Sequence, residues 1–333
     1  MLTCFDSWRI ARRVAYWARS VFRAELRVNV VCLMQPPYGD FDVTEWARRP
    51  QHQSRTASIG SGQQVRTTMP KIVTVLFMFV AASVAAFAQP APTALVVKDL
   101  APTGKLRAAI NFGNSVLVQK GPRGEPLGVT PELATALAKR LGVSVQFVMY
   151  QAAGKVFEDA TKNAWDIAFI AIDPVRAAEV DFSAPYVVIQ GTYLVRKDSS
   201  LKDVADVDVP GVRIGVGLGS VYDLYLTRTL KNAVLVRNPS GGGAGGIEPF
   251  LAQHLDAAAG VREPLDAYAK DHPDTRVMRG SFEEIRQAIA TPKGRPTGAA
   301  YLHRFVEEMK VNGFVADALK RSGQSAPVAS PAN

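Results

Sequence analysis

Arg176 is the residue of this sequence best suited to binding an anion. Its guanidinium presents a planar fork of N–H donors that can hold a carboxylate through two hydrogen bonds, and it keeps its charge at physiological pH. Glu179 follows three residues later, so a surface ion pair on a helix is the alternative interpretation. A buried Arg176 would instead need an anionic partner.

The segment Gly215–Ser220, with the sequence GVGLGS, is a second candidate for anion binding. It joins a predicted strand over 213–216 to a predicted helix over 222–231, and backbone N–H groups at such a helix start favour negative charge. Its G-x-G-x-G spacing differs from the dinucleotide pattern G-x-G-x-x-G, so a nucleotide site is not indicated. Ser220 either contacts the anion or belongs to a tight turn that needs small residues.

Residue types that carry catalysis or hold metals are scattered along the chain. The four histidines show no His-x-x-x-His spacing, and both cysteines lie within the first 32 residues. Ser183 and Ser220 lack the sequence context of an activated nucleophile. We therefore expect no catalytic residues, no metal site and no cofactor, and we expect a binding protein instead of an enzyme.

The charge distribution argues against nucleic-acid binding. The formal net charge is +9, but residues 1–68 contain ten Arg and only five acids. From Gln89 onward the excess of basic residues falls to three. Basicity is mostly a property of the front of the chain, so the body lacks the electrostatic signature of a nucleic-acid partner.

An export signal is predicted at 69–88. Met69 and Lys71 precede an apolar run from Ile72, which ends in the small-x-small pattern Ala86-Phe87-Ala88 that signal peptidase requires. Cleavage is expected after Ala88, and a retained membrane anchor is the alternative. Residues 1–68 are predicted to be an N-terminal extension outside the mature protein, either an over-extended reading frame or a cytoplasmic segment.

Apolar patterning in the body alternates between strands and helices. Leu133, Leu137 and Leu141 form the buried stripe of a helix that Thr130 would cap and Gly142 would end. Strands are expected at 106–111, 143–149, 166–172, 192–195, 213–216, 234–236 and 256–260, and helices at 156–163, 222–231, 247–254 and within 299–319. This order predicts an α/β protein with two doubly wound, mostly parallel sheets and hence two lobes.

Four segments together resemble the family 3 periplasmic solute-binding proteins of ABC transporters: LRAAI, GEPLGVTPELATALAKRLGV, AWDIAFIAIDPVRAAEVDFSAPY and GVRIGVGLGS. The resemblance covers Gly104 to Gly323, and its most specific part is Arg176 followed by VDFSAPY at 180–186. It implies the type II periplasmic-binding-protein fold, with two lobes joined by hinge crossings near 191–196 and 285–291. The implied boundaries are a linker at 89–103, lobe one at 104–193 and 286–323, lobe two at 194–285, and a disordered tail at 324–333.

The resemblance also implies roles for particular residues. Arg176 would grip the ligand's α-carboxylate, Gly219 and Ser220 would contribute from lobe two, and Phe112 or Asn114 would stack on or hydrogen-bond to the ligand. Core packing is an equal alternative for Phe112 and Asn114.

Two departures from the family pattern bear on the ligand. Phe169–Asp173 is apolar up to Asp173, where the family carries small hydroxyl residues. The acid that would neutralise an α-ammonium is replaced by Val261, followed by Arg262. Either Asp173 or Glu263 takes that role, or the ligand is a carboxylic acid without an amine. The predicted ligand-binding residues are Arg176, Asp173, Phe112, Asn114, Ala171, Gly219, Ser220 and Arg262.

The expected partners are a small anionic or zwitterionic solute and the membrane permease of an ABC transporter, with no nucleic acid. The chain is expected to be a periplasmic monomer. Two alternatives remain open at this point. One is a periplasmic enzyme resembling cyclohexadienyl dehydratase, with Asp173 as general acid. The other is a membrane-anchored sensory receptor domain.

Overall fold

The computed structural model describes residues 91–331. The expected N-terminal extension, the signal peptide at 69–88 and both cysteines lie outside the described residues. In residues 91–331, no helix is long and apolar enough to cross a membrane.

The first part of the described chain alternates strands with helices, as the sequence predicts. Its elements are α3 (Ala94–Leu100), β1 (Lys105–Asn111), β2 (Gln119–Lys120), β3 (Pro126–Leu127), α4 (Val129–Leu141), β4 (Ser144–Tyr150), α5 (Ala153–Glu158) and β5 (Ile167–Ala171). Strand β1 pairs in parallel with both β4 and β5. Together with two C-terminal helices, α9 (Pro296–Val311) and α10 (Phe314–Arg321), these elements form what we call the first lobe.

The pattern restarts in the second lobe. Its elements are β7 (Arg213–Gly217), α6 (Val221–Thr229), β8 (Val234–Asn238), α7 (Ile247–Ala252), β9 (Ala257–Val261), α8 (Arg262–Asp271) and β10 (Thr275–Val277). Strand β7 pairs in parallel with β8 and β9. The chain is therefore a mixed α/β protein in which each lobe is built around parallel strands, as predicted.

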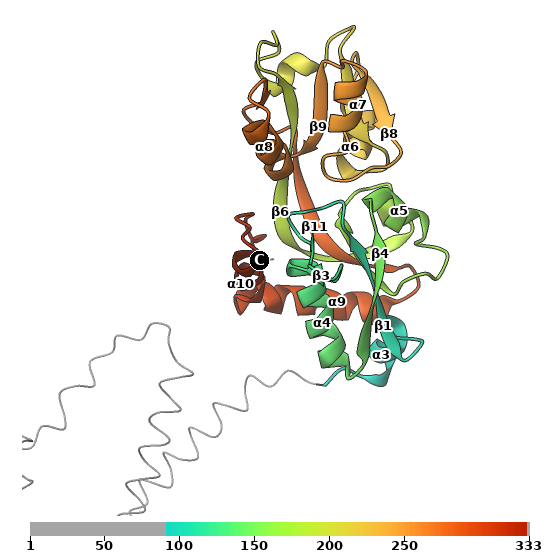
Figure 1. Cartoon of the computed structure of the whole chain (residues 1–333). Helices are drawn as coiled ribbons and strands as arrows, with labels where there is room; N and C mark the ends of the chain where they lie inside the picture. The colour runs from blue at the N-terminus through green and yellow to red at the C-terminus, as the bar shows by residue number, and fades with distance from the viewer. Residues whose placement is uncertain (1–90, 332–333) are drawn as a thin grey trace, which may run out of the picture. The chain divides into compact units, whose positions relative to one another are not determined.

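Two long strands belong to both lobes (Figure 1). Strand β6 (Val180–Arg196) and strand β11 (Glu283–Pro292) pair with each other in antiparallel fashion. Strand β11 also pairs with β5 of the first lobe, while the end of β6 pairs with β9 and β10 of the second. All described strands except β2 and β3, which pair with each other, thus form one sheet in the order β4-β1-β5-β11-β6-β9-β7-β8, with β10 beside β6.

The buried face of α4 carries the predicted leucine stripe. Leu133, Leu137 and Leu141 are buried, and Gly142 ends the helix with a left-handed φ of 71°. The predicted cap at Thr130 is wrong, because the helix begins two residues earlier than expected, at Val129, and its N-cap is Gly128. Gly128 has a φ of 113°, a conformation that favours glycine.

Helix α3 occupies part of the segment predicted to be a linker, which corrects that expectation. The side chain of Thr93 accepts a hydrogen bond from the backbone N–H of Val96, and Asp99 accepts one from Gly298 at the start of α9. Val96 and Leu100 are buried. The segment is therefore docked on the first lobe by a cap, a polar bond and apolar packing.

The expected disordered tail is also wrong over residues 324–331. Val328 forms a β-bridge with Val187 in β6, and Ala326 and Ala329 are buried. The ammonium of Lys310 donates to the carbonyl of Ser330 at 3.0 Å. These contacts hold the end of the described chain against β6 and α9.

Candidate ligand-binding site

The side chain of Arg176 is completely buried between the lobes. It opens a short 3₁₀ turn, Arg176–Ala178, shortly after β5. Its Nη1 donates to the carbonyl of Ala171 at 3.0 Å, and its Nη2 donates to the carbonyl of Gly219 in the second lobe at 3.0 Å. Within the described chain, its Nε has no hydrogen-bond partner. The surface-pair interpretation with Glu179 is therefore wrong.

Burial sets the electrostatics of this guanidinium. It lowers the pKa of Arg176 to about 10, while the nearby carboxyl groups of Asp173 and Glu283 act in the opposite direction. The group stays charged at neutral pH. A buried cation with an unused donor is well suited to an anionic ligand.

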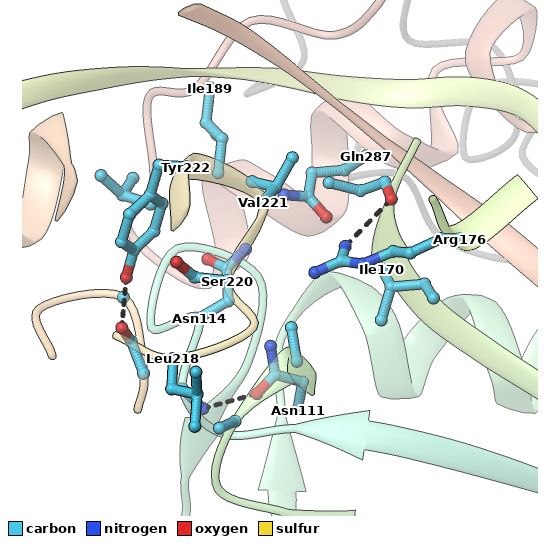
Figure 2. Close-up of a pocket in the computed structure, with 17 residues that line it drawn as sticks. Asn111, Asn114, Ile170, Arg176, Ile189, Leu218, Ser220, Val221, Tyr222 and Gln287 are labelled. Atoms are coloured by element: carbon cyan, nitrogen blue, oxygen red, sulfur yellow. Dashed lines mark hydrogen bonds between the residues drawn. The ribbon is translucent and has the colours of Figure 1, made fainter. Parts of the chain in front are cut away.

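A cavity of about 40 Å³ lies beside Arg176 and is lined by residues of both lobes (Figure 2). This volume is about the share of one or two water molecules in the liquid. Besides Arg176, its polar lining consists of neutral side chains: Asn111, Asn114, Ser220, Tyr222 and Gln287. The rest of the lining is apolar or glycine, including Ile170, Ala171, Ile189 and Val261.

The Gly215–Ser220 turn reaches the cavity with fewer free amides than its sequence suggests. The Ser220 hydroxyl lines the cavity and caps α6 by accepting from the N–H of Asp223 at 3.1 Å. The N–H of Gly219 donates to the carboxylate of Asp223 at 2.9 Å. Asp223 thus takes the anionic role at this helix start, and the carbonyl of Gly219, not its N–H, faces Arg176.

Asp173 lies near Arg176 but does not line the cavity. One of its carboxylate oxygens accepts from the N–H of Val175, and the other forms an ion pair with Arg228 of α6 at 2.8 Å. This ion pair joins the two lobes. Its partner Arg228 carries no motif signal in the sequence, because the two residues are 55 positions apart.

Glu283, the first residue of β11, completes a small cluster of charges with Asp173, Arg176 and Arg228. The pKa of Glu283 is raised to about 7, first by burial and then by the charge of Asp173, while the two arginines oppose the shift. Its Oε2 is buried and, among the described residues, unpartnered. Sequence reasoning missed this residue as well.

Phe112 and Arg262 lie outside the cavity lining. Phe112 packs against the hydrophobic core, with the ammonium of Lys120 5.7 Å from its ring centre. Arg262 donates to the side chain of Gln190 in β6 and to the carbonyls of Met278 and Gly280. Arg262 therefore ties β6 to the segment between β10 and β11. Of the predicted site residues, Arg176, Asn114, Ala171 and Ser220 line the cavity, and Gly219 bonds to Arg176.

Glycine backbones bring the lobes into direct contact. The N–H of Gly243 donates to the carbonyl of Gly113. A Cβ placed on Gly154 would lie 2.9 Å from the carbonyl oxygen of Leu218 and 3.1 Å from the Cα of Gly219. Such distances leave no room for side chains, so the lobes are closed on each other.

Residues 115–324 match the bacterial extracellular solute-binding proteins, family 3. The chain belongs to this family. This assignment agrees with the resemblance carried by Arg176 and the VDFSAPY segment. It also accounts for two lobes linked by β6 and β11.

The chain is similar to a curated L-cystine-binding protein in sequence and to solved binding proteins in fold. The chain is 26% identical over 202 residues to the L-cystine-binding protein TcyJ of Escherichia coli K12, covering 58% of this chain and 73% of the relative. A mutant of ArgBP from T. maritima superimposes with a TM-score of 0.59 at 19% identity, over 68% of this chain and 99% of that one.

A third relative is an ancestral amino-acid-binding protein, AncCDT-1, described as a precursor of cyclohexadienyl dehydratase. It superimposes with a TM-score of 0.57 at 25% identity, over 68% of this chain and 98% of that one.

Proposed function

We propose that this protein captures a small carboxylate-bearing solute between its lobes and delivers it to the permease of an ABC transporter. The single observation that carries this proposal is the buried Arg176, whose Nε has no acceptor in the described chain. A carboxylate could accept hydrogen bonds from Nε and one Nη together, in the side-on arrangement that guanidinium groups favour.

The two carbonyl oxygens on Arg176 indicate how binding and closure are coupled. Ala171 contributes its carbonyl from the first lobe, and Gly219 contributes one from the second. A solute carboxylate would add to this set, so that one guanidinium holds both lobes and the ligand. Because the cavity holds only about 40 Å³, the lobes must separate, by bending of β6 and β11, before a solute can enter.

The family supports a role outside the cytoplasmic membrane. Its members are extracellular solute-binding proteins, and the predicted signal at 69–88 would export the chain, with cleavage after Ala88. N-terminal sequencing of the exported protein tests this step. A first residue at Gln89 is the expected result, and retention of residues 69–88 would favour a membrane-anchored receptor instead.

A thermal-shift screen of amino acids and organic acids tests the proposed function. At a few hundred times the dissociation constant, a true ligand stabilises the folded state by roughly 3–4 kcal/mol. Arg176→Gln should abolish the shift while the variant stays folded by circular dichroism. Arg140→Gln is the matched control, because Arg140 pairs with Glu308 within the first lobe and away from the cavity. An undiminished shift in Arg176→Gln would remove Arg176 from the site.

A dehydratase activity is a weaker candidate. It is suggested by the family resemblance of the sequence and by the likeness to AncCDT-1. The carboxylate of Asp173, the expected general acid, is held by Arg228 and by the N–H of Val175 instead of facing the cavity. Incubation of the purified protein with prephenate should leave the substrate unchanged, and its consumption would establish an enzyme.

A further inference from the structure

Over the described residues, the cavity lining carries a positive charge and no negative charge. Of the described residues that line it, Arg176 is the one charged side chain, and none is acidic. We propose that the ligand carries a carboxylate but no cationic group, and that hydroxy acids fit better than amino acids. This inference rests on the proposed function and narrows the solute class.

Three carboxylates approach the site, but none of them lines the cavity. Asp173 is paired with Arg228. Asp223 accepts from the N–H of Gly219 and pairs with Arg237 at 2.9 Å. Glu283 does not line the cavity, and it has Asp173 close enough to disfavour its charged form. An α-ammonium in the cavity would therefore meet no carboxylate in the described part of the cavity wall. Glu263 and Glu283, whose buried Oε2 atoms have no partner among the described residues, both lie outside the lining.

Val261 forms part of the apolar wall of the cavity. It is the last residue of β9, is 4% exposed and lines the cavity. An ammonium desolvated against this side chain would keep its charge without a partner, which is strongly unfavourable. We expect an amino acid to bind at least about 100-fold more weakly than the hydroxy acid of the same skeleton.

The neutral polar groups of the cavity suit a hydroxyl. The Oδ1 of Asn114 is buried and, in the part of the chain that the structure describes, accepts no hydrogen bond. A ligand hydroxyl could donate to it, whereas a simple carboxylate would leave it unsatisfied. Ser220 and Gln287 lie on the same cavity (Figure 2) and can complete the hydrogen bonds of a hydroxyl.

Calorimetric titration with matched pairs tests this inference. The pairs are glycolate and glycine, L-lactate and L-alanine, L-glycerate and L-serine, and L-malate and L-aspartate, each measured on the wild type and on Arg176→Gln. Tighter binding of a hydroxy acid, lost in Arg176→Gln, supports the inference. If amino acids bind as tightly or more tightly through Arg176, the inference is wrong while the proposed function stands. If no acid of either class binds, or if binding is indifferent to Arg176, the proposed function fails as well.

Val261→Asp provides a gain-of-function test. Val261 is the N-cap residue of α8, a position where Asp is well tolerated. The added carboxylate should raise amino-acid affinity at least about 10-fold and weaken hydroxy-acid binding. Val261→Asn is the matched uncharged control and should show neither change. A folded Val261→Asp protein with unchanged selectivity would overturn the charge argument.

Discussion

The ion pair between Asp173 and Arg228 should control how firmly the lobes close. Asp173 is fully buried and contributed by the first lobe, while Arg228 comes from α6 of the second. Replacing Arg228 with Gln leaves the Asp173 carboxylate without its counter-charge whenever the lobes are closed. In the open form water can solvate Asp173, so the penalty falls mainly on the closed form.

The magnitude follows from the geometry. The pair is 2.8 Å apart between N and O, and unit charges about 4 Å apart attract by ~4 kcal/mol at the effective dielectric near a protein surface. The Arg228 side chain is 38% exposed, so screening reduces this to about 1.5–3 kcal/mol. Arg228→Gln should therefore weaken ligand binding by about 10- to 150-fold.

The second lobe offers a closely matched control for Arg228→Gln. Arg237 pairs with Asp223 at 2.9 Å, with side chains 39% and 5% exposed, but both residues belong to the same lobe. Arg237→Gln should lower thermal stability about as much as Arg228→Gln does, yet it should change ligand affinity less than about 3-fold. Small-angle scattering should show a larger radius of gyration for ligand-free Arg228→Gln only. Equal affinity losses in the two variants would refute the role of the ion pair in closure.

Two further substitutions, at Glu283 and Gly154, test the residues around the cavity between the lobes. Burial raises the pKa of Glu283 from 4.5 to about 7, so its ionisation lowers the stability of the folded state as the pH rises through that value. Glu283→Gln removes this cost. The variant should match the wild type in stability below pH 4.5 and exceed it by about 1–2 kcal/mol above pH 7, after allowance for solvent screening. Urea unfolding at pH 4 and pH 8 checks this, and a pH-independent difference would argue against it. Gly154→Ala should weaken ligand binding by about 10-fold with little loss of unfolding free energy, because the added Cβ would meet Leu218 and Gly219 of the other lobe. Unchanged affinity would show that the lobes need not approach so closely.

Local chemistry made the lobe architecture predictable. Alternating apolar runs and a stripe at Leu133, Leu137 and Leu141 suffice to indicate parallel strands with crossover helices, and β5 is buried along its whole length as expected. Guanidinium chemistry and the following VDFSAPY segment also predict anion binding at Arg176, and this stays a prediction. Its complete burial agrees with that prediction.

The remaining site features depend on contacts between distant segments. Arg228 pairs with Asp173 only because closure brings α6 against the turn after β5. Arg262 looks like a cation next to the ligand in sequence, but the carbonyls of Met278 and Gly280 take its donors. Helix α8 was missed because it is short and mostly polar: Leu265 is its one buried residue, and the apolar stripe with Tyr268 and Ala269 spans little more than one turn.

The most direct test of the account is a crystal structure of the protein with the acid that gives the largest thermal shift. The ligand carboxylate should lie about 2.7–2.9 Å from Nε and one Nη of Arg176, within the cavity between the lobes. A ligand bound elsewhere, or bound in the cavity with Nε still lacking an acceptor, would contradict the proposal that Arg176 recognises the solute.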